Sequence, residues 1–170
     1  MQIRDIRQRL AGLGAKDTHI DRILRSWTRL QSLDTKRQKA GSFFPLAVRN
    51  ELPGLLAELN SLVRLHSEHP GADGSARLLV ELGDGQMVES VLLPRDGVCV
   101  STQVGCAVAC QFCMTGKSGL IRQLSSAVIV AQVVLARSIR LVKRVVFMGM
   151  GEPAHNLDNV LEAIDLLGNI

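Results

Sequence analysis

The C-terminal half of the chain follows an order of elements that few folds accommodate: strand, helix, strand, helix. Residues 98–104 alternate as a half-buried strand does, and residues 144–148 form a short apolar run. Residues 125–140 are rich in Val, Ala and Ile, and residues 157–167 have helical spacing, with Asn156 as the expected N-cap. This order predicts the opening of a parallel α/β fold, and two such units are too few to close a barrel.

The N-terminal part has a helical period instead. Apolar residues recur at three- and four-residue steps over residues 17–33, and a further helical stretch is expected over residues 45–65, broken or restarted at Pro53. Residues 69–74 read as a turn-rich linker. The next two strands, expected around Gly83-Asp84-Gly85, form a hairpin.

These patterns divide the chain into three parts. We expect a small helical accessory domain over residues 1–70, a linker and β-hairpin over residues 71–97, and an α/β domain over residues 98–170. The sequence stops where another strand is due, so we expect a truncated form of a longer protein.

Charge is unevenly distributed along the chain. Residues 1–70 hold 12 Lys/Arg against 7 Asp/Glu, and residues 71–170 hold 8 against 9. A basic segment of this kind suits contact with a phosphate backbone or forms a solvated helix face, and charge alone leaves both open. The charged N-terminus lacks the pattern of a signal peptide, and no apolar run reaches the roughly 18 to 20 residues of a membrane span. We expect a cytoplasmic protein without a membrane partner.

The four cysteines fall within a short stretch, and three of them are spaced C-x3-C-x2-C: Cys106, Cys110 and Cys113. Three thiolates on a tight loop can each ligate one iron of a [4Fe–4S] cluster. The fourth iron then lacks a protein ligand and can chelate the amino and carboxylate groups of S-adenosylmethionine. The alternative is a structural zinc site with Cys99 as fourth ligand, but zinc sites usually have paired C-x2-C knuckles and this chain has one.

A second motif, Gly149-Met150-Gly151-Glu152-Pro153-Ala154, follows the expected strand at 144–148. It matches a dinucleotide fingerprint loosely, and no following strand ends in an acidic residue. We interpret it as a glycine-rich turn that accepts a small ligand, with Glu152 available to an ammonium group. A plain β–α turn is the structural alternative. Gly116-Lys117-Ser118 resembles the end of a P-loop, but Gln111 stands where its first Gly would be.

With these two motifs in order, the chain resembles the RlmN/Cfr family of radical S-adenosylmethionine RNA methyltransferases. The resemblance rests on VES at 88–90, VCVSTQVGCAVACQFCMTG at 98–116 and FMGMGEPAHNLDNV at 147–160, with Gly119, Arg122 and Leu124 between them. It implies an N-terminal helical RNA-contacting domain, a β-hairpin and the first β/α units of an incomplete radical SAM barrel, a partial TIM barrel.

The resemblance also implies roles for individual residues. Cys106, Cys110 and Cys113 match the cluster ligands, and Gly151 and Glu152 match the cosubstrate-binding pair. Glu89 falls where the family has a general base, and Cys99 where it has the thiol that resolves a covalent enzyme–RNA intermediate. Without the resemblance, Glu89 reads as a hairpin carboxylate and Cys99 as a small residue of a strand.

The implied reaction is methylation of adenine C2 through a methyl-cysteine and a deoxyadenosyl radical, with a disulfide formed as the product leaves. The implied partners are 23S ribosomal RNA, with transfer RNA as a further candidate, and an electron donor for the cluster; a monomer is the simplest state. C8 of adenine is also a target in this family. Only Cys99 lies outside the triad, so we expect these residues alone to bind a cluster without completing methyl transfer. The competing classes are another radical enzyme and a non-catalytic iron–sulfur or zinc module that binds nucleic acid.

Overall fold

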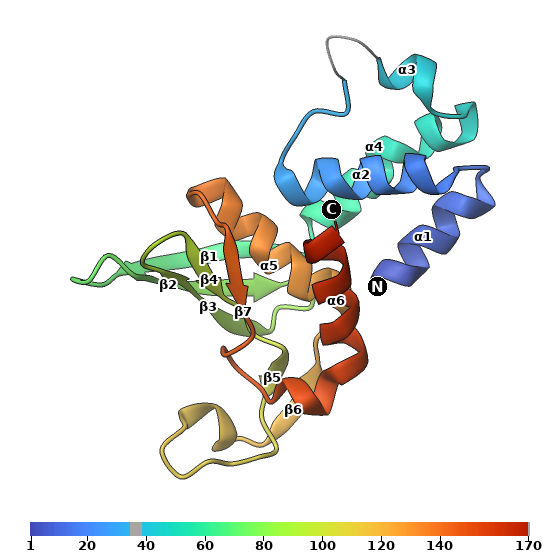
Figure 1. Cartoon of the computed structure of the whole chain (residues 1–170). Coiled ribbons are helices and arrows are strands. Elements are labelled where there is room, and N and C mark those ends of the chain that lie inside the picture. Colours follow the sequence, from blue (N-terminus) through green and yellow to red (C-terminus); the bar gives the residue numbers. More distant parts are fainter. Residues whose placement is uncertain (35–38, 170) are drawn as a thin grey trace.

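The structure is a computed structural model that describes residues 1–34 and 39–169. Its N-terminal part is helical, and Figure 1 shows these helices gathered on one side, away from the sheet. They are α1 (Ile3–Gly12), α2 (Asp17–Arg29), α3 (Ala40–Phe43) and α4 (Leu46–Asn60). Helices α5 (Ser126–Ile139) and α6 (Leu157–Asn169) lie between this group and the sheet.

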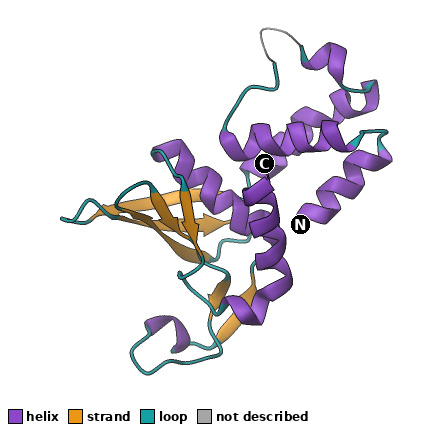
Figure 2. Cartoon of the chain, viewed as in Figure 1, coloured by secondary structure: helices purple, strands orange, loops and turns teal. Residues whose placement is uncertain are grey.

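A five-stranded sheet forms the second part, and Figure 2 shows it beside the helices. Its strands are, in spatial order, β1 (Val63–Pro70), β2 (Ala76–Leu82), β3 (Met87–Leu93), β4 (Gly97–Cys99) and β7 (Arg144–Val146). The first four pair antiparallel, whereas β4 and β7 pair parallel through the α5 crossover. A separate ribbon joins β5 (Gln103–Gly105) to β6 (Leu120–Gln123). The predicted α/β class and the hairpin around residues 83–85 are confirmed.

Three details differ from the sequence-based expectations. The expected helix over 45–65 ends at Asn60, and the expected linker at 69–74 is a hairpin turn, because Val63–Pro70 forms a strand paired with β2. This pairing satisfies backbone groups that a helix would satisfy locally. Helix α4 also runs through Pro53 without a break. The buried side chains of Leu52, Leu55 and Leu59 hold it against the core, which offsets the loss of one N–H donor.

The third difference concerns the strand expected at 98–104, which divides into β4 and β5 in two different sheets. At the division, the backbone of Ser101 pairs with the side-chain amide of Gln132 in α5 instead of another strand. The chain therefore leaves the main sheet immediately before the cysteine loop.

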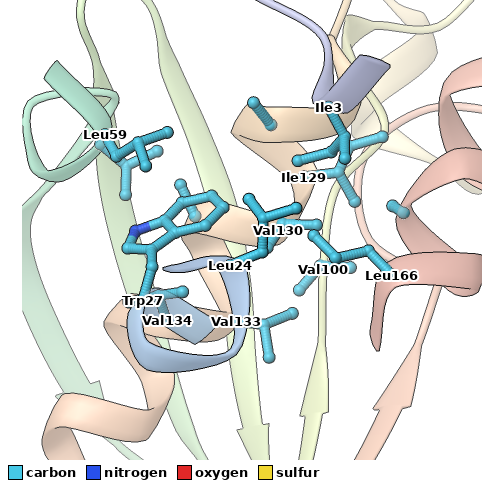
Figure 3. Close-up of a cluster of buried hydrophobic side chains, with 14 of the residues drawn as sticks. Ile3, Leu24, Trp27, Leu59, Val100, Ile129, Val130, Val133, Val134 and Leu166 are labelled. Carbon is cyan, nitrogen blue, oxygen red and sulfur yellow. The ribbon is translucent and has the colours of Figure 1, made fainter. Parts of the chain in front are cut away.

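One hydrophobic core joins the accessory helices to the sheet. Trp27 and Leu24 of α2 pack among Val130, Val133 and Val134 of α5, as Figure 3 shows. Truncating a fully buried leucine such as Leu24 costs ~2–5 kcal/mol in cores of this kind. The boundaries 1–70, 71–97 and 98–170 stay a prediction, because the core is continuous across them. Among the described residues, no helix has the length and apolarity needed to cross a membrane.

Candidate functional site

The three cysteines of the triad lie on one loop that begins directly after β5. The loop is closed by the Cys106 N–H, which donates to the Gly119 carbonyl at 3.0 Å, and the Cys113 N–H donates to the Cys110 carbonyl at 3.0 Å. Cys106 is buried, Cys113 is half-buried and Cys110 is exposed. The predicted position of the triad, on a loop after a strand, is confirmed.

The thiols of Cys106, Cys110 and Cys113 do not surround a common metal position in this structure. In residues 1–34 and 39–169, no group of three or more His, Cys, Asp and Glu side chains is arranged to hold a metal. Phe112, the residue before Cys113, is 93% exposed. All four cysteines are free, so the chain contains no disulfide. The loop supplies the donors expected for a cluster without presenting them in the bound arrangement.

Tight backbone packing nevertheless restricts this loop. Ala109 has a φ of 52°, and a Cβ added at Gly116 would lie 2.6 Å from the Cα of Ala109. Gly105 has a φ of 75°, and a Cβ there would lie 2.0 Å from the Gly119 carbonyl oxygen. Glycine is required at both positions for the loop to fold back on itself.

The chemistry of the donor set fits an iron–sulfur cluster. Hydrogen bonds from the Thr115 hydroxyl and backbone N–H lower the pKa of the Cys113 thiol. A lower pKa favours the thiolate, which is the form that ligates iron. Three cysteines on one short loop, with no carboxylate or histidine among residues 106–119, form a soft ligand set.

The glycine-rich turn at 149–152 lies against the segment that leads into the cysteine loop. The Gly149 N–H donates to the Val100 carbonyl at 3.1 Å, and the Thr102 N–H donates to the Met150 carbonyl at 2.8 Å. A Cβ on Gly149 would lie 2.7 Å from the Val100 carbonyl oxygen. The turn therefore approaches this backbone more closely than any other residue type allows.

Glu152 is held at the end of this turn from two sides. Its N–H donates to Gln103 Oε1 at 2.8 Å, and its Oε1 accepts from the Ala154 N–H at 3.0 Å. Gln103 Nε2 in turn donates to Gln123 Oε1 at 2.9 Å in β6. The carboxylate is half-buried and oriented, so it can accept a hydrogen bond from an ammonium group that enters beside the turn.

Glu89 and Cys99 lie on the same face of the main sheet. Cys99 pairs with Val91, and Glu89 stands two residues from Val91 along β3. Ser90 between them faces α5, where its Oγ donates to Gln132 Oε1 at 2.9 Å. Side chains alternate along a strand, so Glu89 and Cys99 both face away from α5. The two residues implied by the resemblance are therefore diagonal neighbours on adjacent strands.

These two groups differ in environment. The Glu89 carboxylate is partly exposed and accepts from Arg77 Nη1 at 3.0 Å. Cys99 is 8% exposed, and burial raises the pKa of its thiol, an effect partly opposed by the Met148 backbone N–H. Cys99 is thus protonated at neutral pH, and its use as a nucleophile requires a base.

Four residues organise this region through contacts that the sequence did not predict: Ser101, Gln132, Met150 and Asn156. Asn156 was expected as the N-cap of the last helix, but its Oδ1 accepts from the Asn159 side-chain amide at 2.8 Å, and its Nδ2 donates to the carbonyls of Thr102 and Leu124 at 2.8 and 2.7 Å. Gln132 was visible as the single amide in a helix of Val, Ala and Ile. A polar residue on such a helix requires a buried partner.

A loop of three cysteines after one strand and a glycine-rich turn after the neighbouring parallel strand define the class of the C-terminal part. Residues 100–169 match the family profile described as the Radical SAM superfamily.

The whole chain is similar to more specific relatives. It is 73% identical over 170 residues to a "Probable RNA methyltransferase" of Ectopseudomonas mendocina (strain ymp), covering 99% of this chain and 49% of that protein. It is 71% identical over 168 residues to one of Azoarcus sp. (strain BH72), covering 99% and 48%. The crystal structure of a radical SAM methyltransferase from Sphaerobacter thermophilus superposes with a TM-score of 0.70 at 31% identity, covering 98% of this chain and 50% of that one.

These comparisons confirm the resemblance to radical SAM RNA methyltransferases. They also confirm the fold class, an N-terminal helical part followed by a partial radical SAM fold. The chain spans about half the length of the curated relatives it matches.

Proposed function

We propose that this chain is part of a radical SAM enzyme that methylates C2 of an adenosine in 23S ribosomal RNA, with transfer RNA as a second substrate class, in the cytoplasm. The observation that supports this most is the adjacency of four groups: the cysteine loop, the turn at Glu152, and Glu89 and Cys99 on one sheet face. Relatives described as RNA methyltransferases add RNA as the substrate.

Cys106, Cys110 and Cys113 would hold a [4Fe–4S] cluster, since they are the three thiols of the loop. When bound there, the cluster supplies the electron that cleaves S-adenosylmethionine to a deoxyadenosyl radical, and an external electron donor restores it. The loop's part is to keep the thiolates available, which the hydrogen bonds to Cys113 favour.

Gly151 and Glu152 would bind the cosubstrate. Gly151 lies against Gln103, and the Gln103 side chain in turn accepts the Glu152 N–H. A fixed carboxylate accepts a hydrogen bond from the ammonium group of the methionine moiety, and the glycine before it lets the turn pack directly against Gln103.

Glu89 would remove the C2 proton of adenine, and Cys99 would attack the methyl-bearing thiol sulfur to release the product. The Glu89 carboxylate would be the acceptor for a proton on this face of the sheet, where it pairs with Arg77 Nη1 at 3.0 Å. The Cys99 sulfur gains a bond to the second sulfur as the bond from that sulfur to the methylene carbon on adenine breaks. That carbon keeps the electron pair and takes up the proton that Cys99 loses, so it becomes the methyl group of the product. The chain has no cysteine other than Cys99 outside the triad, so the second thiol is not among these residues.

The basic N-terminal segment would contact the RNA backbone. Arg7 and Arg9 are engaged in ion pairs with acidic neighbours. A groove of about 440 Å³ on α2 is lined by Arg22 and Arg25 together with neutral polar residues and one aspartate. Guanidinium groups beside hydroxyl and amide groups suit phosphate contacts. We further propose the division into residues 1–70, 71–97 and 98–170, and a monomeric state.

The first experiment is anaerobic reconstitution of the chain with iron and sulfide, followed by absorbance and iron counting. A triple Cys106/Cys110/Cys113→Ala variant is the control. We expect roughly four irons in the wild type and none in the variant. One tightly bound zinc and no iron would refute the radical mechanism and favour a nucleic-acid-binding module.

A second experiment separates the methyltransferase from another radical enzyme. In a protein extended to the length of the relatives, Cys99→Ala is expected to accumulate a covalent enzyme–RNA adduct. Another radical chemistry would leave product formation unchanged in this variant. The 170-residue chain by itself is expected to form no methylated RNA.

A further inference from the structure

Gln132 is a fully buried amide in the middle of an apolar helix. Its side chain is 0% exposed, as are those of Ile129, Val130 and Val133 around it in α5. An unsatisfied amide in such surroundings costs several kcal/mol, so its partners identify what the residue does.

Those partners lie mainly on one residue of the opposite segment. Gln132 Oε1 accepts from the Ser101 N–H at 3.0 Å, and Gln132 Nε2 donates to the Ser101 carbonyl at 3.0 Å. Oε1 also accepts from Ser90 Oγ at 2.9 Å. The amide thus pairs with Ser101 as a neighbouring strand would, at the point between β4 and β5 where no strand does.

The Ser101 side chain extends this link to two parts of the candidate site. Its Oγ donates to the Glu89 carbonyl oxygen at 2.5 Å and accepts from the Met150 N–H at 2.9 Å. The Glu89 N–H in turn donates to Met150 Sδ at 3.3 Å. A hydroxyl with one donor and two acceptor sites is used here to join β3 to the glycine-rich turn.

We propose that Gln132 and Ser101 are positioning residues that set the turn Gly149–Glu152 against Glu89. Gln132 fixes the backbone of Ser101, and the Ser101 hydroxyl then fixes Met150 relative to β3. The proposal rests on the proposed function only in naming the ligand of the turn, S-adenosylmethionine. Neither residue touches that ligand in this account; both act through the main chain of Met150 and Glu89.

The test measures amide hydrogen exchange residue by residue in the 170-residue chain. Ser101→Ala removes the hydroxyl while keeping the backbone pair with Gln132, and Gln132→Met removes the pair while keeping an unbranched side chain of similar length. Thr102→Val is the matched control, because Thr102 is 1% exposed and its Oγ1 has no hydrogen-bond partner among the described residues.

We expect exchange at the Met150 N–H about tenfold faster in Ser101→Ala and Gln132→Met, as the loss of one buried hydrogen bond gives. Exchange in α5 and β2 should stay within about twofold of the wild type, and Thr102→Val should match the wild type throughout. Gln132→Glu is expected to behave as the wild type at pH 5, where burial keeps its carboxyl protonated with one donor and one acceptor.

The same variants are then made in a protein extended to the length of the relatives, loaded with the cluster and titrated with S-adenosylmethionine by calorimetry. We expect affinity about tenfold weaker in Ser101→Ala and Gln132→Met and unchanged in Thr102→Val. A wild type that binds no S-adenosylmethionine would refute the proposed function, and the exchange experiment would still decide the positioning role.

Two results would overturn the proposal. One is unchanged protection of Met150 in Ser101→Ala. The other is a uniform loss of protection across the chain in Ser101→Ala, which would show general destabilisation in place of a local role. If Gln132→Met fails to fold, Ser101→Ala and Gln132→Glu decide the matter.

Discussion

Replacing Gly151 by alanine tests how closely the cosubstrate turn is packed. Gly151 has a φ of 97°, a conformation that alanine rarely adopts. An added Cβ would lie 2.5 Å from Gln103 Cβ, 2.7 Å from its Cγ and 2.8 Å from its backbone N. The backbone and Cβ of Gln103 cannot move aside by a simple rotation, so the substitution adds a steric clash to the backbone strain.

The two contributions can be estimated separately. Backbone strain at a positive φ costs ~1–2 kcal/mol, and overpacking of a close contact costs ~1–3 kcal/mol. Gly151→Ala should therefore lower the free energy of unfolding by ~2–5 kcal/mol. Gly74 is a matched control, because its φ is 82° and nothing lies within 4 Å of an added Cβ. Gly74→Ala should cost ~1 kcal/mol from strain alone.

The assay is urea unfolding of both variants beside the wild type, compared at equal m-values. For a chain of this length, ~1 kcal/mol corresponds to a shift in Tm of ~2–4 °C, so thermal melts provide a second measurement. Equal losses in Gly151→Ala and Gly74→Ala would refute the clash with Gln103. In cluster-loaded protein, Gly151→Ala should also weaken S-adenosylmethionine binding, and Gly74→Ala should not.

Three further predictions follow from the environments of single residues. Burial raises the pKa of the Cys99 thiol, so the rate of its alkylation should rise with pH only above the ordinary thiol pKa of about 8.5. Alkylation of Cys99 should also be slower than that of exposed Cys110, and peptide mass spectrometry measures both rates. Burial alone would raise the pKa of Asp84, but a backbone N–H and Arg122 at 2.6 Å outweigh it and lower the pKa. The stability contributed by ionised Asp84 is present above the unfolded pKa of about 3.9 and is lost as pH falls through the folded pKa. Asp84→Asn should therefore lower the free energy of unfolding by under ~1 kcal/mol at pH 7 and leave it unchanged near pH 2, as measured by urea unfolding. Asn156→Ala leaves buried carbonyl groups without its two hydrogen bonds and should cost ~1–3 kcal/mol in the same assay; no loss would contradict its structural role.

The elements that the sequence predicted correctly are those specified by local pattern. The α5 helix, the hairpin strands and the α6 helix each have their period and turn residues within their own segment. Strand β1 was missed because its identity depends on β2, with which it pairs along its length. A short alternation of Val63 and Leu65 next to a helix cannot be distinguished from the end of that helix without the partner strand.

The candidate site shows the same division between local and non-local information. The cysteine spacing and the glycine-rich turn were recognisable because each lies in one short segment. The adjacency of Glu89 and Cys99 depends on the register of β3 against β4, which no spacing in the sequence specifies. The link from Gln132 to Ser101 spans 31 residues, and only the presence of a lone amide in α5 could have indicated it.

The parallel pairing of β4 with β7 explains why two distant motifs meet. The α5 crossover returns the chain to the edge of the sheet where β4 begins, so β7 runs in the same direction as β4. Parallel strands end at the same edge of a sheet, and the segment after Cys99 and the turn after Val146 therefore lie side by side. Backbone hydrogen bonds from Val100 to Val146 and from Thr102 to Met150 extend this contact past the ends of the strands. A substitution that separated β4 from β7 would therefore move the glycine-rich turn away from the cysteine loop. It would do so although every residue proposed to bind the cluster or S-adenosylmethionine remained in the chain. The pairing of these two short strands is thus as necessary to the proposed chemistry as the cysteines themselves.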